Sequence, residues 1–135
     1  RVFGENKTWG GLLGGVLLGT LVFFIQQVLY VIPFFHDLSL FDYSIMPTTL
    51  GFFMAFGALL GDLVKSFVKR RLGRTPGSSW FLFDQIDYVL GAFVFIIPFY
   101  MPSAALFLIL LLLAPVFHYA ANYLAFTLGL KKVWW

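Results

Sequence analysis

Charged side chains concentrate in one stretch of an otherwise apolar chain. Residues 61–91 hold eight of the fifteen charged residues in the sequence. If residues 62–70 are helical, five polar or charged side chains share one face, because positions three, four, seven and eight apart lie on the same side of an α-helix. These five are Asp62, Lys65, Ser66, Lys69 and Arg70. Arg71 falls off this face, which favours a lipid headgroup or a purely topological role for it.

Two carboxylates follow this basic helix across a short polar linker. Asp84 and Asp87 are three residues apart near the start of the next predicted helix, so they also share a face. Carboxylates bind Mg²⁺, and lysine and arginine neutralise phosphate oxygens. A row of cations opposite two carboxylates is therefore typical of a site for a metal-bound polyphosphate. Helix capping by the two carboxylates, and a purely topological role for residues 69–71, are the alternatives.

The composition indicates a single-domain membrane protein over residues 1–135. Of the 135 residues, 61% are hydrophobic and only 11% are charged, which is too apolar for a soluble domain of this size. The absence of cysteine excludes disulfides, thiolate metal sites and cysteine nucleophiles. The net charge of +3 comes from basic residues at predicted membrane boundaries. This placement favours phosphorylated ligands or anionic lipids, and no nucleic acid, as partners.

Four apolar segments predict an all-α, polytopic fold with four transmembrane helices. These cover residues 9–32, 47–71, 81–97 and 103–128, with Pro47 in the first turn of the second helix. The first segment has no formal charge and is long enough to cross a ~30 Å hydrocarbon core. Residues 33–46 are predicted to form a loop, and residues 73–79 a turn-rich linker. The charged half of the second helix must leave the hydrocarbon or face a wet cavity.

The distribution of basic residues predicts the orientation. With four spans, both termini and the 70–84 linker lie on one side, together with all nine lysines and arginines. The positive-inside rule makes that side cytoplasmic. We therefore expect a multi-pass protein of the plasma membrane whose active site faces the cytoplasm and is formed by residues 5–15 and 61–91. His36, in the opposite loop, and His118, in an apolar run, are not expected to take part.

The segment before the first helix carries a second anion-binding feature. Lys7 directly precedes the helix start, where free backbone N–H groups favour an anion. Capping of the helix by Asn6 or Thr8 is the structural alternative. Within the helix, three glycines repeat every four residues, which predicts either close helix packing or a groove for a ligand. They are Gly11, Gly15 and Gly19.

Two blocks of sequence resemble the phosphatidate cytidylyltransferase superfamily. ENKTWGGLLGG at residues 5–15 is similar to its KTW-glycine segment. GDLVKSFVKR at residues 61–70, followed by FDQID at residues 83–87, is similar to its signature. The short linker and the DQID form most closely resemble the archaeal branch, the CDP-archaeol synthases. Relatives in that branch carry a further N-terminal helix, so we expect a fifth span that this sequence does not include.

The resemblance implies a membrane-embedded cytidylyltransferase. Such an enzyme transfers CMP from CTP to an isoprenoid ether-lipid phosphate, giving CDP-archaeol and pyrophosphate in archaeal phospholipid biosynthesis. The residues implied to be catalytic are Asp62, Lys65, Lys69, Asp84 and Asp87, of which Asp62, Asp84 and Asp87 are the expected ligands of Mg²⁺. The residues implied to bind CTP or the lipid phosphate are Asn6, Lys7, Thr8, Ser66, Lys69 and Arg70.

Other functions stay open on the sequence alone. Nothing in it separates ether from ester lipids, so a CDP-diacylglycerol synthase acting on acyl phosphatidate is an alternative. A small anion transporter needs charges through the depth of the membrane, whereas these gather at one boundary. A lipid-binding protein would use the basic face but has no use for the carboxylates. The 18 phenylalanines suggest a lateral opening for lipid chains between the later helices. Oligomeric state, the number of metal ions and base preference are not determined.

Overall fold

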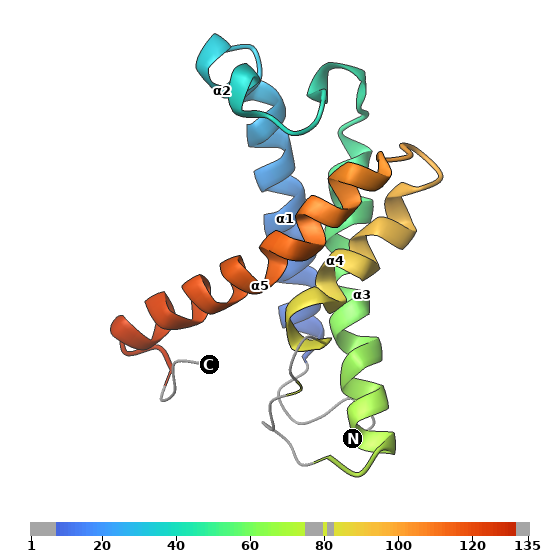
Figure 1. Cartoon of the computed structure of the whole chain (residues 1–135), viewed down its shortest axis with the longest axis vertical. Helices are drawn as coiled ribbons and strands as arrows, with labels where there is room; N and C mark the ends of the chain where they lie inside the picture. Colours follow the sequence, from blue (N-terminus) through green and yellow to red (C-terminus); the bar gives the residue numbers. More distant parts are fainter. Residues whose placement is uncertain (1–7, 75–79, 81–82, 132–135) are drawn as a thin grey trace.

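The computed structural model describes residues 8–74, 80 and 83–131, and all regular structure in them is helical (Figure 1). The predicted all-α class is therefore confirmed. The elements in chain order are α1 (Trp9–Leu29), α2 (Pro33–Leu38), the 3₁₀-helix η1 (Tyr43–Ile45), α3 (Thr49–Arg71), α4 (Phe83–Ile96) and α5 (Ala104–Thr127).

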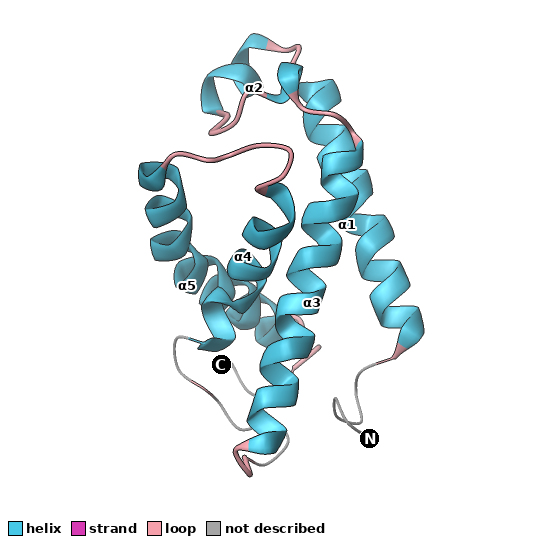
Figure 2. Ribbon diagram, turned by 90° about the vertical axis from the view of Figure 1, so that its right-hand side faces the viewer, coloured by secondary structure: helices cyan, strands magenta, loops and turns pink. Residues whose placement is uncertain are grey.

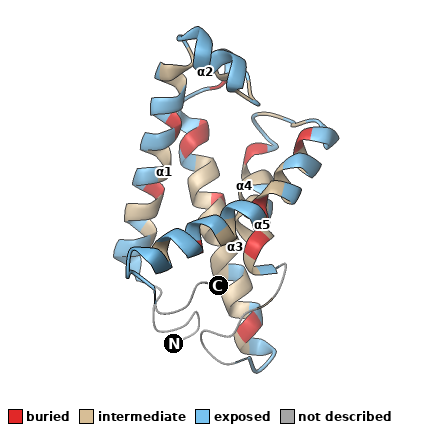
Figure 3. Ribbon diagram, turned by 60° about the vertical axis from the view of Figure 1, so that its left-hand side comes forward, coloured by how far each residue is buried: buried red, intermediate tan, exposed pale blue. Residues whose placement is uncertain are grey.

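Three helices, α1, α3 and α5, are long and apolar enough to cross a membrane. Their outward side chains are apolar and exposed, for example Leu17 at 70% and Leu112 at 75% (Figure 3). Extended apolar surface of this kind indicates contact with lipid. The chain is therefore a membrane protein. Helix α4 has 14 residues and is about 21 Å long, which is shorter than the hydrocarbon core.

Helix α3 is the central helix of the bundle. It packs against α1 on one side and against α4 on the other, and its interface with α4 is the more extensive (Figure 2). Helix α5 packs on α4, crosses the bundle obliquely, and extends away from it towards its C-terminal end (Figure 1). The α3–α4 pair is therefore the rigid unit on which a site can be built.

Glycines let the backbones of α3 and α4 touch. An alanine Cβ at Gly57 would lie 2.5 Å from the carbonyl oxygen of Gly91, and one at Gly61 would overlap the carbonyl oxygen of Asp87. Small residues four apart on one helix allow this close approach in membrane proteins. This glycine contact was not singled out in the sequence, yet it sets the separation of the two helices beside the charged residues.

The glycines of α1 serve helix packing. An added Cβ at Gly15 would lie 2.9 Å from Leu59, and one at Gly19 would lie 2.6 Å from Ala55, both on α3. At Gly11 it would meet only the capping threonine of the same helix, at 3.1 Å. The packing alternative is thus confirmed for the second and third glycines of the repeat.

Residues 33–46 are not the plain loop that was predicted. They contain α2 and η1, because Pro33 has the backbone angle of a first helical position and Asp42 accepts a hydrogen bond from the backbone of Ser44 at the start of η1. The segment is tied to α1 by Gln27, whose amide donates to the carbonyl oxygen of Met46 at 2.7 Å. A small apolar core lies beneath it, made of Phe23, Met46, Leu50 and Ile96.

The predicted helix boundaries differ from the observed ones by up to three residues. The first helix ends at Leu29 instead of residue 32, and α3 begins at Thr49, so Pro47 precedes the first turn and accepts a hydrogen bond there from the Leu50 N–H. Helices α4 and α5 begin and end within two residues of their predicted limits. The predicted linker falls largely on residues 75–79, which lie outside the described residues.

Candidate functional site

Three predicted carboxylates surround a single lysine. The Nζ of Lys65 lies 3.1 Å from Asp62 Oδ1, 3.2 Å from Asp84 Oδ1 and 2.8 Å from Asp87 Oδ2. The Lys65 side chain is only 14% exposed and that of Asp87 only 8%. Asp87 Oδ2 has no well-directed hydrogen bond, so its contact with the ammonium is an ion pair. We call Lys65, Lys69 and the three aspartates the charged cluster.

Lys69 completes the cluster one helical turn further along α3. Its buried ammonium donates to both carboxylate oxygens of Asp84, at 3.1 and 3.2 Å. Asp84 lies in the first turn of α4, outside the three candidate spans, and Oδ2 also accepts from the Trp80 backbone N–H at 2.6 Å. The Asp84 carboxylate is therefore held by both lysines and a backbone N–H.

The cluster forms because two helical repeats meet at the glycine contact. Positions 62, 65 and 69 follow the spacing of one helix face, as do positions 84 and 87 on α4. The close approach of the Gly61 backbone to the Asp87 carbonyl, which leaves no room for a Cβ, places these faces against each other. The structure thus brings together all five residues that the resemblance implied to be catalytic.

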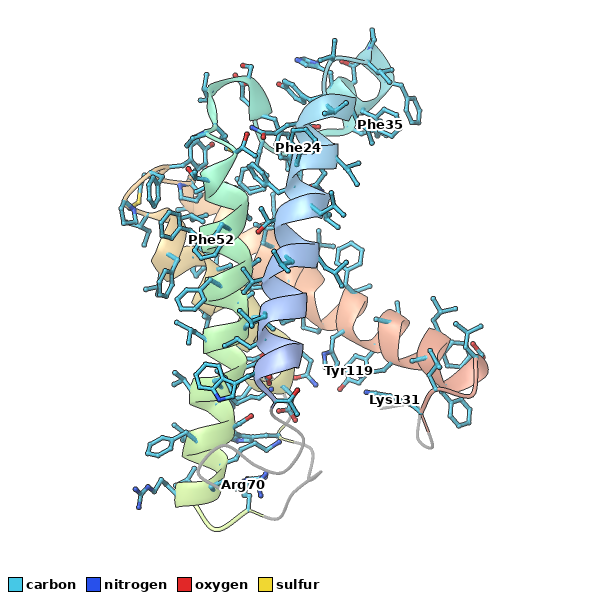
Figure 4. The ribbon with its side chains drawn as sticks, turned by 180° about the vertical axis from the view of Figure 1, so that it is seen from behind. Phe24, Phe35, Phe52, Arg70, Tyr119 and Lys131 are labelled. Carbon is cyan, nitrogen blue, oxygen red and sulfur yellow. The ribbon has the colours of Figure 1, made fainter. Side chains whose placement is uncertain are left out.

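Other predicted residues of α3 lie apart from these contacts. The Arg70 guanidinium donates to the carbonyl oxygen of Arg74 at 2.5 Å, at the end of α3 (Figure 4). The Arg71 guanidinium lies 5.1 Å from the centre of the Phe67 ring, in agreement with its predicted position off the polar face of the helix. The described contacts do not test the role of Ser66, which stays a prediction.

The N-terminal corner of the predicted site is described only at Thr8. Its Oγ1 accepts the Gly11 N–H at 3.0 Å, so Thr8 caps α1 as the structural alternative proposed. Asn6 and Lys7 lie outside the described residues. Their predicted contacts with phosphate and nucleoside stay predictions.

A second polar group, between α4 and α5, was missed in the sequence. Gln85 is only 2% exposed and its Nε2 donates to the Tyr119 hydroxyl at 3.2 Å. Asn122, 8% exposed, accepts from the Lys131 ammonium at 2.6 Å. Figure 4 labels Tyr119 and Lys131 in the C-terminal part of the chain. The signal available in the sequence was the three-residue spacing of Tyr119 and Asn122 on an otherwise apolar helix.

An apolar groove reaches the charged cluster from the α3–α4 crossing. It has a volume of about 450 Å³, and Lys65 and Asp87 are among its lining residues. The rest of the lining is mainly aliphatic and aromatic, and includes Leu60, Val64, Phe83, Leu90 and Phe95. A groove of this character accepts a hydrocarbon chain whose polar end lies at the cluster.

The donor set of the cluster suits a divalent cation. Carboxylate oxygens are the ligands that Mg²⁺ prefers, and three of them already surround one positive charge. Among the described residues, no three acidic, histidine or cysteine side chains form a ready-made metal-binding group. The Lys65 ammonium lies within 3.2 Å of all three aspartates. The residues therefore fit the metal in chemistry, with Lys65 as the cation that holds them in this arrangement.

The fold and the site together define an all-helical membrane protein that gathers lysines and aspartates for phosphate chemistry beside an apolar groove. Comparison with known proteins makes this class specific. The family model described as CarS-like, CDP-archaeol synthase, matches residues 1–135. The chain therefore belongs to the CDP-archaeol synthase family, and it is a CTP-dependent cytidylyltransferase.

Curated relatives match along the whole chain. The CDP-archaeol synthase of Pyrococcus furiosus is 39% identical over 135 residues, covering 100% of this chain and 76% of the relative. That of Thermococcus gammatolerans is 41% identical over 137 residues, covering 100% and 75%. That of Methanoculleus marisnigri is 39% identical over 144 residues, covering 100% and 82%. No solved structure matches the chain. The resemblance seen in two sequence blocks is thus confirmed over the full length.

Proposed function

We propose that the charged cluster carries the transfer of CMP from CTP to the phosphate of an isoprenoid glycerol ether lipid. A phosphate oxygen of the lipid attacks the α-phosphorus of CTP, the bond to the β-phosphate breaks, and pyrophosphate leaves with that electron pair. The products are CDP-archaeol and pyrophosphate. Such a reaction needs no protein nucleophile and depends on positioning and charge neutralisation.

The observation that carries this proposal is the convergence of both lysines and three aspartates beside the apolar groove, which Lys65 and Asp87 line. Lys69 is buried and the Lys65 side chain is largely buried on the same helix face, so they supply positive charge to phosphate oxygens with little competition from water. Arg70, Ser66 and the N-terminal residues Asn6, Lys7 and Thr8 are proposed to add further phosphate or nucleoside contacts.

Magnesium is the proposed cofactor. Asp62, Asp84 and Asp87 would hold it, because their oxygens already face a shared cation. When bound, Mg²⁺ supplies positive charge that polarises the phosphate oxygens and stabilises the leaving pyrophosphate. The lysines are then less compensated by the aspartates and more available to the two phosphate substrates.

The apolar groove is proposed to hold an isoprenoid chain of the acceptor lipid. Its lining joins Lys65 and Asp87 to hydrophobic residues of α3 and α4, so a lipid lying there would have its phosphate at the cluster. This arrangement supports the lateral opening suggested by the phenylalanines, two of which, Phe83 and Phe95, line the groove.

The proposed topology has four crossings in this chain. The beginnings of α1 and α4 and the ends of α3 and α5 lie in the lower half of Figure 1, whereas α2 lies at the top. Although α4 is short, it returns the chain to the upper end from which α5 starts. The basic residues of the described part lie in the second half of α3, directly after it, and after α5, so the positive-inside rule supports a charged cluster on the cytoplasmic side of the plasma membrane.

The test is incorporation of labelled CTP into an organic-extractable lipid by purified protein. Di-geranylgeranylglycerol phosphate is compared with dioleoyl phosphatidate, with and without Mg²⁺. We expect Mg²⁺-dependent product with the ether lipid, and a loss on the order of 10²-fold in Asp87→Asn, because the cluster loses a charged ligand. Asp37→Asn is the matched control. Asp37 lies in α2 beside His36, its side chain is 82% exposed, and it is not part of the charged cluster.

Each of three results would contradict the proposal. Full activity in Asp87→Asn would remove the charged cluster from the reaction. Absence of product from either lipid with the wild-type protein would favour the transport or lipid-binding alternatives. Preference for the acyl lipid would assign the chain to the CDP-diacylglycerol synthase alternative.

A further inference from the structure

Gln85 carries a buried polar atom without a partner. The side chain leaves α4 beside the charged cluster, and its Oε1 is fully buried with no hydrogen-bond partner among the described residues. Its Nε2 is held by the Tyr119 hydroxyl at 3.2 Å. A buried carbonyl oxygen without a donor is costly and rare in folded proteins. The same cost would fall on the amide nitrogen if the carboxamide were turned over, so in both orientations one amide atom lacks a partner.

The two faces of α4 differ in chemistry. Asp84 and Asp87 contact Lys65 on α3, whereas Gln85 contacts α5. On α5, Asn122 lies three residues beyond Tyr119, is buried, and accepts a hydrogen bond from the Lys131 ammonium. One side of α4 therefore presents two carboxylates and the other presents the uncharged carboxamide of Gln85, within a single turn of helix.

A nucleoside triphosphate has the same division. Its triphosphate is anionic, and its base is neutral and offers hydrogen-bond donors and acceptors. Cytosine has an exocyclic amine as donor beside a ring nitrogen acceptor, whereas uracil has a carbonyl oxygen in place of the amine. A carboxamide pairs an acceptor with a donor, so one held in a fixed orientation complements the edge of cytosine and opposes that of uracil.

We propose that Gln85 recognises the base of CTP, with its carboxamide oxygen accepting a hydrogen bond from the exocyclic amine. Tyr119 is a positioning residue that fixes the carboxamide through Nε2. Binding of the nucleotide opens the α4–α5 contact enough for the base to reach Gln85, which the limited packing of α5 on the bundle permits. This inference rests on the proposed function, since it places the base next to the charged cluster that binds the triphosphate.

The test is the ratio of kcat/KM for CTP to that for UTP, measured by competition between the nucleotides at fixed lipid. Gln85→Met keeps the side-chain length and removes the amide. In this variant we expect kcat/KM for CTP to fall at least about 10-fold, with little change in kcat/KM for UTP. The reason is that a site built around a hydrogen bond distinguishes the two bases through that bond. Tyr119→Phe should lower the ratio by a smaller factor.

Tyr88→Phe is the matched control. The Tyr88 hydroxyl also joins α4 to α5, by donating to the carbonyl oxygen of Ala114 at 3.1 Å, but lies outside the proposed base contact. In Tyr88→Phe the ratio of kcat/KM for CTP to that for UTP should equal that of the wild type. An equal loss for both nucleotides in Gln85→Met would overturn the inference, because a packing role lowers both alike. If Gln85→Met does not fold, an unchanged ratio in Tyr119→Phe overturns it. Failure of the wild type to use CTP would instead contradict the proposed function.

Discussion

The glycine contact between α3 and α4 predicts that one methyl group at Gly57 impairs catalysis without touching the charged residues. In Gly57→Ala the new Cβ would lie 2.5 Å from the Gly91 oxygen, where ordinary contact begins at 3.4 Å. Because the Gly91 oxygen belongs to the backbone and cannot rotate away as a side chain can, α4 must move away from α3 by about 0.9 Å. Asp84 and Asp87 move with α4, whereas Lys65 and Lys69 stay on α3.

A displacement of this size at a reacting centre costs on the order of 10²-fold in rate. We therefore expect kcat/KM for CTP to fall by about that factor. Alanine is the better helix former by ~1 kcal/mol, so local helix propensity works in the opposite direction. The assay is transfer of labelled CMP to lipid, normalised to folded protein by gel filtration and thermal unfolding in detergent.

The matched control is Gly14→Ala on α1, where an added Cβ meets nothing within 4 Å. It should leave thermal unfolding and kcat/KM close to those of the wild type. A folded Gly57→Ala with activity within about threefold of the wild type would refute the reasoning, since it would mean that the cluster tolerates a shift of nearly 1 Å. Gly91→Ala tests the same contact from the other helix if the first variant is unstable.

Three further predictions concern stability. Lys65→Met leaves the facing aspartates without their shared cation. In metal-free detergent the free energy of unfolding, measured by chemical denaturation, should therefore fall by about 3 kcal/mol, and it should recover when Mg²⁺ is added. Thr8→Ala should cost ~1 kcal/mol through the lost cap on α1, whereas Thr8→Ser should not; a rise in KM for CTP in Thr8→Ala without a loss of stability would instead indicate nucleotide contact. Hydrogen bonds from the side chain and backbone of Ser44 lower the pKa of Asp42, so its stabilising effect is present above its unfolded-state pKa of about 3.9 and lost as pH falls below it. Asp42→Asn should flatten the thermal stability profile in that acidic range.

The helical class and the two helix faces that supply the charged cluster were readable from the sequence. Local spacing is sufficient for both, because a helix repeats its faces every three to four residues whatever it packs against, but it also put Ser66 and Arg70 on the first face. Hence Lys65 and Lys69 were assigned to one face and Asp84 and Asp87 to another before any contact was known. The loop over residues 33–46 was mistaken because short helices depend on caps and local packing more than on periodicity.

The identity of each partner was decided by tertiary structure alone. Spacing cannot tell that one ammonium contacts three aspartates, because that depends on how far α3 and α4 approach each other, which Gly57, Gly61 and Gly91 determine. Nor can it show that Gln85 faces α5 while its neighbours face α3. The sequence by itself thus determined which side chains share a helix face. The packing of the helices decided which faces meet, because that choice depends on contacts between residues far apart in the chain.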